Sequence, residues 1–413
     1  MNKLFRRDFT MVVAGQIISL FGNAILRFAL PLYLLRETDS SSLFGVVTAC
    51  SFIPMVIFSL FGGVIADRRN KRNIMVALDF FTAALIMGFS FALGRVSLVP
   101  LMITVLMILY GISGLYQPAV NASIPLITER NMLMQGNAVI NMVGTLAGLL
   151  GPVIGGVLFG SFGIMTILYV SAVCFVFSAV MEIFIHIPYE KNTDGKGIFK
   201  SVSSDLSESF KFVKNEKPVF LSVIGVLALF NMVLTAAIIV GIPVIVVQIF
   251  GKSDTALGIT EGVMGLGGLA GGLIAGAVGK KMRLKNNYLT LTACSLAAFV
   301  MGIAVLNSVP ANVGYIIITA ASFAVMCVST LFSVSMMTEV QRQTHPHLLG
   351  KIMAMIIAVA GCSQPVGQAG YGFLFDIFAG RSYIVMMGAA VLAAGISLYS
   401  KKIFAVLEEE DVK

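Results

Sequence analysis

Charged residues are scarce in this chain. Only 12% of its 413 residues are Asp, Glu, Lys or Arg, whereas 58% are hydrophobic; a soluble domain carries about 25% charged residues. A soluble fold of this length could not hide so many apolar side chains, because too much of its surface stays in water. The composition therefore predicts a protein whose main solvent is lipid. Tryptophan is absent, so Tyr and Phe would have to anchor it at the membrane surface.

Groups that carry enzyme chemistry are also few. The five cysteines lie inside apolar stretches without metal-ligand spacing, which favours simple packing roles. Of the three histidines, His345 and His347 form a pair with no third ligand beside it, and no Walker-type phosphate loop is found. We therefore expect no metal, no cofactor and no ATP drive, and a membrane-embedded enzyme is the weakest alternative. The net charge of +8 does not indicate nucleic-acid binding, because the basic residues lie in short, separated clusters.

What the chain has instead is long apolar stretches. A bilayer-spanning helix needs about 20 apolar residues. Stretches of that length lie near 9–35, 43–66, 73–94, 98–120, 135–159 and 164–187, and then, after a polar segment, near 218–250, 255–279, 287–307, 311–337, 348–375 and 380–403. The pattern predicts an all-α integral membrane protein with twelve transmembrane helices in two six-helix bundles.

Lysine and arginine concentrate in alternate loops, and cytoplasmic loops are the ones enriched in these residues. The loop after 43–66, the linker 188–217 and the loop after 255–279 hold half of the 28, whereas the outer loops hold only Arg36, Arg95, Lys252 and Arg381. We therefore expect a cell-membrane protein with both termini in the cytoplasm.

The two halves repeat each other. Gly62-Gly63 and Gly271-Gly272 each precede a basic cluster, at an offset of 209, and Pro152 matches Pro365 at an offset of 213. Parallel six-helix repeats are typical of alternating-access transporters. We expect an N-terminal bundle at 1–187, a cytoplasmic linker at 188–217, a C-terminal bundle at 218–404 and a cytoplasmic tail at 405–413.

The stretch GGVIADRRNKR at 62–72 resembles the loop 2–3 signature of the major facilitator superfamily, with Asn70 where the family usually has glycine. The resemblance covers essentially the whole chain. It implies close packing of this helix end and a charged latch that closes the cytoplasmic side. The latch residues would be Gly63, Asp67, Arg68, Lys71 and Arg72, with Glu129 and Arg130 of a neighbouring loop.

The stretch 148–156 resembles the helix-5 signature of the superfamily's drug:proton antiporters. Its GPxxGG core is present as Gly151, Pro152, Gly155 and Gly156, although Ala147 stands where that family has a further glycine. In that family the signature accompanies export, and its glycines are expected to pack against the glycine-rich stretch 255–279. The first helix, with SLFG at 19–22 and RFALPLYLL at 27–35, and the stretch ASIPLITERN at 122–131 are similar in sequence to bacterial macrolide and siderophore exporters.

Ionisable residues inside a membrane are costly, so each one is a functional candidate. Arg27 lies mid-span and would either bind an anionic group or form a cross-helix salt bridge, with Glu261 as one partner. Glu261 is the first candidate for proton coupling. We expect Asp79 to join the cytoplasmic charge network of Asp67, and Glu182 to be interfacial.

A substrate cavity needs polar and aromatic residues on the helices that line it in this superfamily. The candidates are Asn23, Tyr110, Tyr116, Gln117, Phe230 and Asn231. The resemblance implies a proton-coupled antiporter that exports amphipathic, drug- or macrolide-like compounds and acts as a monomer. A siderophore or lipid exporter, and an uptake symporter of a small solute, remain as alternatives.

Overall fold

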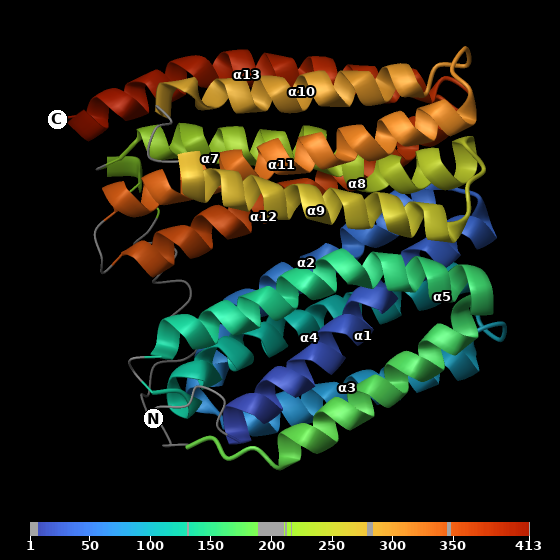
Figure 1. Cartoon of the computed structure of the whole chain (residues 1–413), viewed down its shortest axis with the longest axis vertical. Coiled ribbons are helices and arrows are strands. Elements are labelled where there is room, and N and C mark those ends of the chain that lie inside the picture. The colour runs from blue at the N-terminus through green and yellow to red at the C-terminus, as the bar shows by residue number, and fades with distance from the viewer. Residues whose placement is uncertain are drawn as a thin grey trace. The chain divides into compact units, whose positions relative to one another are not determined.

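The computed structural model describes residues 7–129, 132–188, 210, 213–215, 217–278, 284–344 and 348–412. Within this part of the chain the regular structure is entirely helical (Figure 1). The first half contains α1 (Arg7–Thr38), α2 (Ser41–Arg68), α3 (Lys71–Ala92), α4 (Leu98–Ile127) and α5 (Leu133–Ile183). The second half contains α7 (Val219–Phe230), η2 (Asn231–Thr235), α8 (Ala236–Pro243), η3 (Val244–Ile249), α9 (Asp254–Val278), η5 (Leu284–Asn286), α10 (Asn287–Ala304), α11 (Ala311–Gln343), α12 (Leu349–Ile377) and α13 (Ser382–Val412).

The apolar stretches account for these helices. Among the described residues, 10 helical segments are long and apolar enough to cross a membrane, and the run from α7 to η3 forms one of them. Helix α5 covers two of the expected spans, which meet at Gly163, where φ is 72° and the helical path breaks. Helix α12 covers the expected span 348–375. Each of the predicted apolar stretches thus lies on a helix.

The chain folds into two compact units. One comprises Met1–Thr38 and Cys50–Val202, and the other comprises Asp39–Ala49 and Ser203–Lys413. Helix α2 therefore begins in the second unit and continues in the first. The exact bounds of the linker 188–217 stay a prediction, because most of that segment lies outside the described residues.

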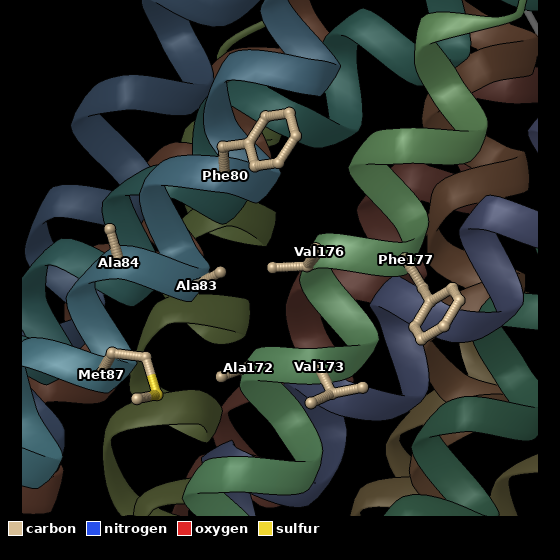
Figure 2. Close-up of a pocket in the computed structure, with 8 residues that line it drawn as sticks. All are labelled: Phe80, Ala83, Ala84, Met87, Ala172, Val173, Val176 and Phe177. Atoms are coloured by element: carbon tan, nitrogen blue, oxygen red, sulfur yellow. The ribbon is translucent and has the colours of Figure 1, made fainter.

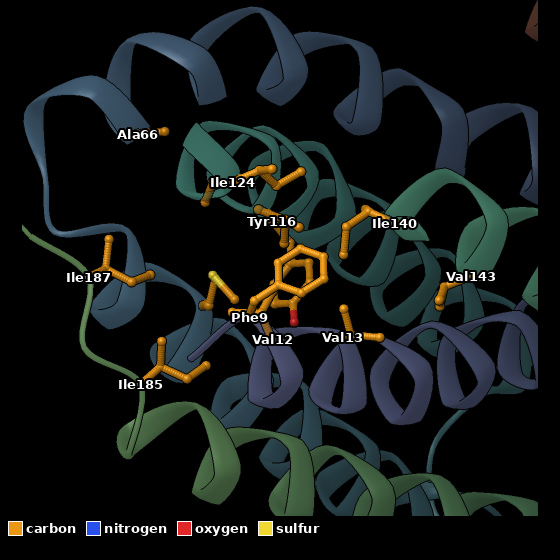
Figure 3. Packing of buried hydrophobic residues seen from close by; sticks show 13 residues of the cluster. Phe9, Val12, Val13, Ala66, Tyr116, Ile124, Ile140, Val143, Ile185 and Ile187 are labelled. Carbon is orange, nitrogen blue, oxygen red and sulfur yellow. The ribbon is translucent and has the colours of Figure 1, made fainter. Parts of the chain in front are cut away.

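In the first unit, α5 packs along α1 and α3, and α3 packs against α4. The apolar core near the start of α1 gathers side chains from several helices (Figure 3). Phe9 and Val13 of α1, Tyr116 of α4 and Ile140 of α5 lie together there. This packing fixes four helices around the polar groups described below.

The second unit repeats that arrangement. Helix α10 packs against α13 and α11, as α3 does against α5 and α4, and α10 and α13 run side by side in Figure 1. Helix α13 continues to Val412, so the expected tail at 405–413 is largely helical instead. The extension is held because Phe404 and Leu407 are fully buried and Lys285 pairs with Glu408 at 3.9 Å.

The duplicated glycines make the same kind of contact in both units. A Cβ atom on Gly62 would come within 2.7 Å of the carbonyl oxygen of Gly114, on α4. A Cβ atom on Gly271 would overlap the carbonyl oxygen of Cys327, on α11. Glycine is required at both positions because the two backbones touch, which is how small residues bring membrane helices together.

We predict that Gly271→Ala destabilises the protein, because the new methyl group meets backbone that cannot move aside. Overpacking of this kind costs about 1–3 kcal/mol, which would appear as a lower thermal unfolding temperature of the purified protein in detergent. Gly272→Ala is the matched control, since a Cβ atom at Gly272 has no neighbour within 4 Å. Equal unfolding temperatures for the two variants would contradict the proposed close contact.

Candidate functional site

A chain of hydrogen bonds lies inside the first unit. The amide nitrogen Nε2 of Gln16 on α1 donates to the hydroxyl of Tyr116 on α4, at 2.8 Å. That hydroxyl donates to Oε1 of Glu182 on α5, at 2.6 Å. The chain ties three helices together through one buried carboxyl group.

A second carboxyl group lies beside this chain. Asp79 on α3 is 1% exposed and accepts a hydrogen bond from the Ser19 hydroxyl at 3.1 Å. It lies close enough to Glu182 for the two groups to interact electrostatically. Among the described residues no Lys, Arg or His forms an ion pair with either carboxyl group.

Two expectations about these acids were wrong. Glu182 is not interfacial but fully buried, because Tyr116 reaches it across the unit. Asp79 does not join the basic cluster after α2, because its side chain points inward to Ser19 on α1. The sequence did contain an indication of this buried site. Gln16 and Ser19 are polar residues on one face of an otherwise apolar helix, and such residues need polar partners inside the protein.

A small internal cavity adjoins the two acids. Its volume is about 30 Å³, which is room for a water molecule or two and far below the size of a drug-like ligand site. It is lined by Ser19, Leu20, Asn23, Asp79, Thr82, Ile112, Ser113, Tyr116, Gln117 and Phe175. The predicted cavity residues Asn23, Tyr116 and Gln117 line this small internal space, and their role in substrate binding stays a prediction. Tyr116 itself is 6% exposed and belongs to the core.

Arg27 lies further along α1 from this cavity. Its guanidinium carbon lies 3.9 Å from the centre of the Tyr110 ring, and Nη2 lies 3.5 Å from the sulfur of Met55. Asn23, one turn earlier, donates to the Ser113 hydroxyl at 3.1 Å. Within the described part of the first unit Arg27 forms no ion pair, and its buried Nε has no hydrogen-bond partner. Pairing with Glu261 stays a prediction, because the two residues belong to different units.

The predicted cavity residues of the second unit are tied into helix packing. Phe230 is 4% exposed, and its ring lies 5.9 Å from that of Phe332, so it is a core residue and not an open cavity wall. Asn231 begins the π-helical segment η2 and donates from Nδ2 to the carbonyl oxygen of Ala360 at 3.3 Å. Such segments are frequent at functional sites, so Asn231 stays a candidate.

Glu261 lies in the second turn of α9 and is only partly exposed. No hydrogen bond or ion pair of this side chain is found among the described residues. A carboxyl group in that setting has no partner that would keep it ionised. Its predicted role in proton coupling therefore remains open to experiment.

The predicted latch lies at the end of α2. Gly63 is exposed, and Arg68 and Glu129 each have an interaction partner. Asn70, where the family usually has glycine, caps α3 by accepting a hydrogen bond from the backbone N–H of Arg72 at 3.1 Å. Lys71 is the first residue of α3, whereas Arg130 and the side chain of Asp67 lie outside the described residues. The latch therefore stays a prediction.

The glycines of the helix-5 signature contact α1. A Cβ atom on Gly151 would overlap Ala24, and one on Gly155 would lie 3.0 Å from the Phe28 ring. Gly156 is buried, and Pro152 lies inside α5. At the Cβ positions of Gly151 and Gly155 the neighbour is α1. Packing of the signature on the stretch 255–279 stays a prediction, because that stretch belongs to the other unit. On α9, Gly267 and Gly271 face α11.

A contact that the sequence did not reveal joins the start of α2 to the end of α12. Asp376 accepts hydrogen bonds from the backbone N–H groups of Ser41 and Ser42, each at 2.9 Å, and from the Ser40 hydroxyl at 3.2 Å. We call these four residues the Asp376 clamp. The helices approach closely there, since a Cβ atom on Gly45 would meet the Gln368 carbonyl oxygen. The serine run before an apolar stretch was the available signal, because unpaired N–H groups at a helix start attract a carboxylate.

The Asp376 carboxylate lies just beyond the apolar span 348–375. Partial burial acts to raise the pKa of Asp376, but the hydrogen bonds from Ser42, Ser41 and Ser40 outweigh it and hold the pKa below its usual range. A lowered pKa means that the clamp contributes stability at neutral pH and loses it only as the pH falls through that lowered value.

An apolar groove of about 570 Å³ lies between α3 and the second half of α5 (Figure 2). It is lined by Phe80, Ala83, Ala84, Met87, Ala172, Val173, Val176 and Phe177. These side chains offer no polar group to orient a ligand, and a specific ligand site needs a few. Asp79 lies on the same helix but is directed inward, so α3 separates this groove from the buried acids.

Membrane-length apolar helices in two units, with the same close glycine contact in each, are typical of multi-pass membrane transporters. Residues 12–367 match the Major Facilitator Superfamily, and the chain belongs to that family. The predicted fold class is thereby confirmed.

The relatives extend over nearly the full chain. Macrolide efflux protein A of Streptococcus pyogenes is 22% identical over 396 residues, 95% of each chain. The staphyloferrin A transporter of Staphylococcus aureus is 21% identical over 409 residues, 96% of this chain and 98% of that protein. The crystal structure of the nucleoside transporter NupG matches with a TM-score of 0.74 at 13% identity, covering 97% of this chain and 98% of that one. This last likeness concerns the fold alone.

We predict that Asp376→Asn loosens the start of α2. Asparagine keeps a single acceptor oxygen and no charge, so at least one of the two backbone N–H groups loses its partner, at a cost of about 1 kcal/mol. Amide hydrogen exchange of residues 41–44 should become faster at neutral pH. Glu37→Gln is the matched control, an exposed acid nearby on α1. Unchanged exchange in Asp376→Asn would show that the clamp contributes nothing.

Proposed function

We propose that this protein is a proton-coupled exporter of amphipathic small molecules, macrolide-like in character, that works by alternating access. The observation that carries the proposal is the similarity to macrolide efflux protein A over 95% of both chains. The helix-5 signature supports export, because in the family it accompanies drug:proton antiport.

The residues available for recognition suit an amphipathic compound. Arg27 and Tyr110 form a cationic and aromatic pair on neighbouring helices, and the chain holds 30 Phe and 23 Met residues. Flexible apolar side chains repack around bulky ligands at low cost. Few polar side chains lie in mid-span, which argues against uptake of a small hydrophilic solute.

Alternating access requires contacts that form on one side of the membrane and break on the other. The Asp376 clamp holds the start of α2, and the predicted latch lies at the end of the same helix. The two sets of contacts lie at opposite ends of one membrane-length helix, so each is suited to holding that helix at one side of the membrane. We propose that the clamp closes the outer side and that the latch closes the cytoplasmic side.

Proton coupling is supported by carboxyl groups that lie inside the helical spans. Asp79, Glu182 and Glu261 are buried wholly or in part, and among the described residues none of them has a cationic partner. An isolated carboxylate is unfavourable in such surroundings, so these groups are suited to binding protons. Glu261 is the candidate in the second unit.

Siderophore export is the second candidate function. It is favoured by the similarity to the staphyloferrin A transporter over 96% of this chain. Arg27 supports it as well, because a guanidinium without an ion-pair partner in its own unit can bind an anionic group.

We predict that inverted membrane vesicles containing this protein accumulate the macrolide erythromycin when their interior is made acidic. The proton gradient should drive the accumulation, so an ionophore that collapses the gradient should abolish it. Vesicles without the protein are the control. Accumulation of staphyloferrin A in place of erythromycin would support the second candidate, and gradient-independent behaviour with both compounds would overturn both.

We predict that Glu261→Gln lowers gradient-driven erythromycin accumulation about tenfold, because glutamine cannot carry a proton. Exchange of labelled for unlabelled erythromycin without a gradient should persist, since binding and rearrangement are retained. Glu37→Gln, outside the membrane span, should behave like the unmodified protein. If Glu261→Gln transports normally at every pH, Glu261 has no coupling role.

A further inference from the structure

The two acids of the first unit lie in adjacent buried hydrogen-bond groups and interact electrostatically, and among the described residues neither has an ion-pair partner. The titratable groups that face each other there are Asp79 of α3, Tyr116 of α4 and Glu182 of α5, while α1 contributes only the neutral side chains of Gln16 and Ser19. Two carboxylates in such a setting repel each other, and their burial keeps bulk solvent away from them. One of the two negative charges therefore has to be neutralised, and the simplest way is for one carboxylate to bind a proton.

The direction of the hydrogen bonds shows where that proton fits. Gln16 donates to Tyr116, so the phenolic hydrogen of Tyr116 is directed at Oε1 of Glu182. Ser19 donates to Oδ1 of Asp79 in the same way. Each carboxyl group thus receives a hydrogen bond at one oxygen. The other oxygens, Oε2 of Glu182 and Oδ2 of Asp79, are buried and have no partner among the described residues.

From this geometry we infer that Asp79 and Glu182 form a proton-binding site that holds one shared proton inside the first unit. The proton resides on Oδ2 of Asp79 or Oε2 of Glu182, the two buried oxygens without a hydrogen-bond partner. The Ser178 hydroxyl also lies near Asp79 but donates to the carbonyl oxygen of Gly15. Binding makes one O–H bond and removes one negative charge, and release reverses both changes.

The cavity of about 30 Å³ supplies the exchange route. It is lined by Asp79, Ser19 and Tyr116 and extends to Asn23 and Gln117, and it has room for a water molecule that can accept the proton. The cavity wall also includes the apolar Leu20, Ile112 and Phe175, but the polar side chains that reach the cavity can hydrogen-bond a water molecule.

Helix α1 connects this site to the proposed substrate contacts. Gln16 and Ser19, which set the hydrogen bonds of the pair, lie on the same helix as Asn23 and Arg27. A shift of α1 when substrate binds would change the distances to both acids and favour proton release. This last step depends on the proposed function, whereas the existence of the proton site does not.

Infrared spectroscopy of the purified protein tests the site directly, without transport. The protonated pair should give the carbonyl band of a neutral carboxylic acid at neutral pH. The band should lose intensity in both Asp79→Asn and Glu182→Gln. Glu37→Gln, which changes an exposed acid, is the matched control and should leave the band unchanged. A spectrum in which neither Asp79→Asn nor Glu182→Gln alters the band would overturn the proposal.

Tyr116→Phe keeps the aromatic packing and removes only the hydroxyl group, so it serves if the acid variants fail to fold. It should shift the frequency of the band, because Glu182 loses its donor. A folded Tyr116→Phe protein with an unshifted band would count against the site.

Vesicle transport then tests the coupling step. Asp79→Asn and Glu182→Gln should each lower gradient-driven accumulation of erythromycin about tenfold, while exchange without a gradient persists. Loss of the infrared band with normal transport would overturn coupling through this pair. If the unmodified protein transports nothing, the proposed function fails, and the infrared result still decides whether the proton site exists.

Discussion

The interior of a bilayer contains no water, and this single constraint determines where each polar side chain of the chain can lie. Gln16, Ser19, Tyr116 and both acids of the first unit satisfy one another across four helices. Arg27, which cannot lose its charge, lies over an aromatic ring. The carboxyl oxygens of Asp79 and Glu182 that remain without partners are the atoms to which the proposed proton would bind.

Because there is no water in the bilayer, the hydrophobic effect does not drive the helices together. Their association depends instead on close van der Waals contact. Gly62 on Gly114 and Gly271 on Cys327 show one solution used twice, once in each unit. Duplication preserved this backbone contact although the polar residues around it diverged. The scaffold and the chemistry have thus evolved under different restraints, and among the described residues the buried pair of acids is found in the first unit.

The helices could be predicted from the sequence because a 20-residue apolar stretch has few other stable states in lipid. Which helix packs against each face of another helix could not be predicted from the sequence. Gly151 and Gly155 were identified as close-packing residues, but a single sequence does not say which helix fills their open faces, and α1 does so. Glu182 lies near the end of an apolar stretch, so its position indicated an interface; its burial depends on Tyr116, which is distant in sequence and adjacent only in the fold.

Helix α1 then has a double role that follows from its contacts. One part of it supplies Gln16 and Ser19 to the acids, and two turns further Asn23 and Arg27 contact α4. Its glycine-facing side lies against α5 at Ala24 and Phe28, so it cannot tilt there without disturbing the helix-5 signature. A rigid helix that is fixed at its middle transmits a displacement at one end to the other. The Gly-Pro segment of α5 is therefore the surface on which α1 packs, and it restricts the directions in which α1 can move. Its association with export would follow from this restriction.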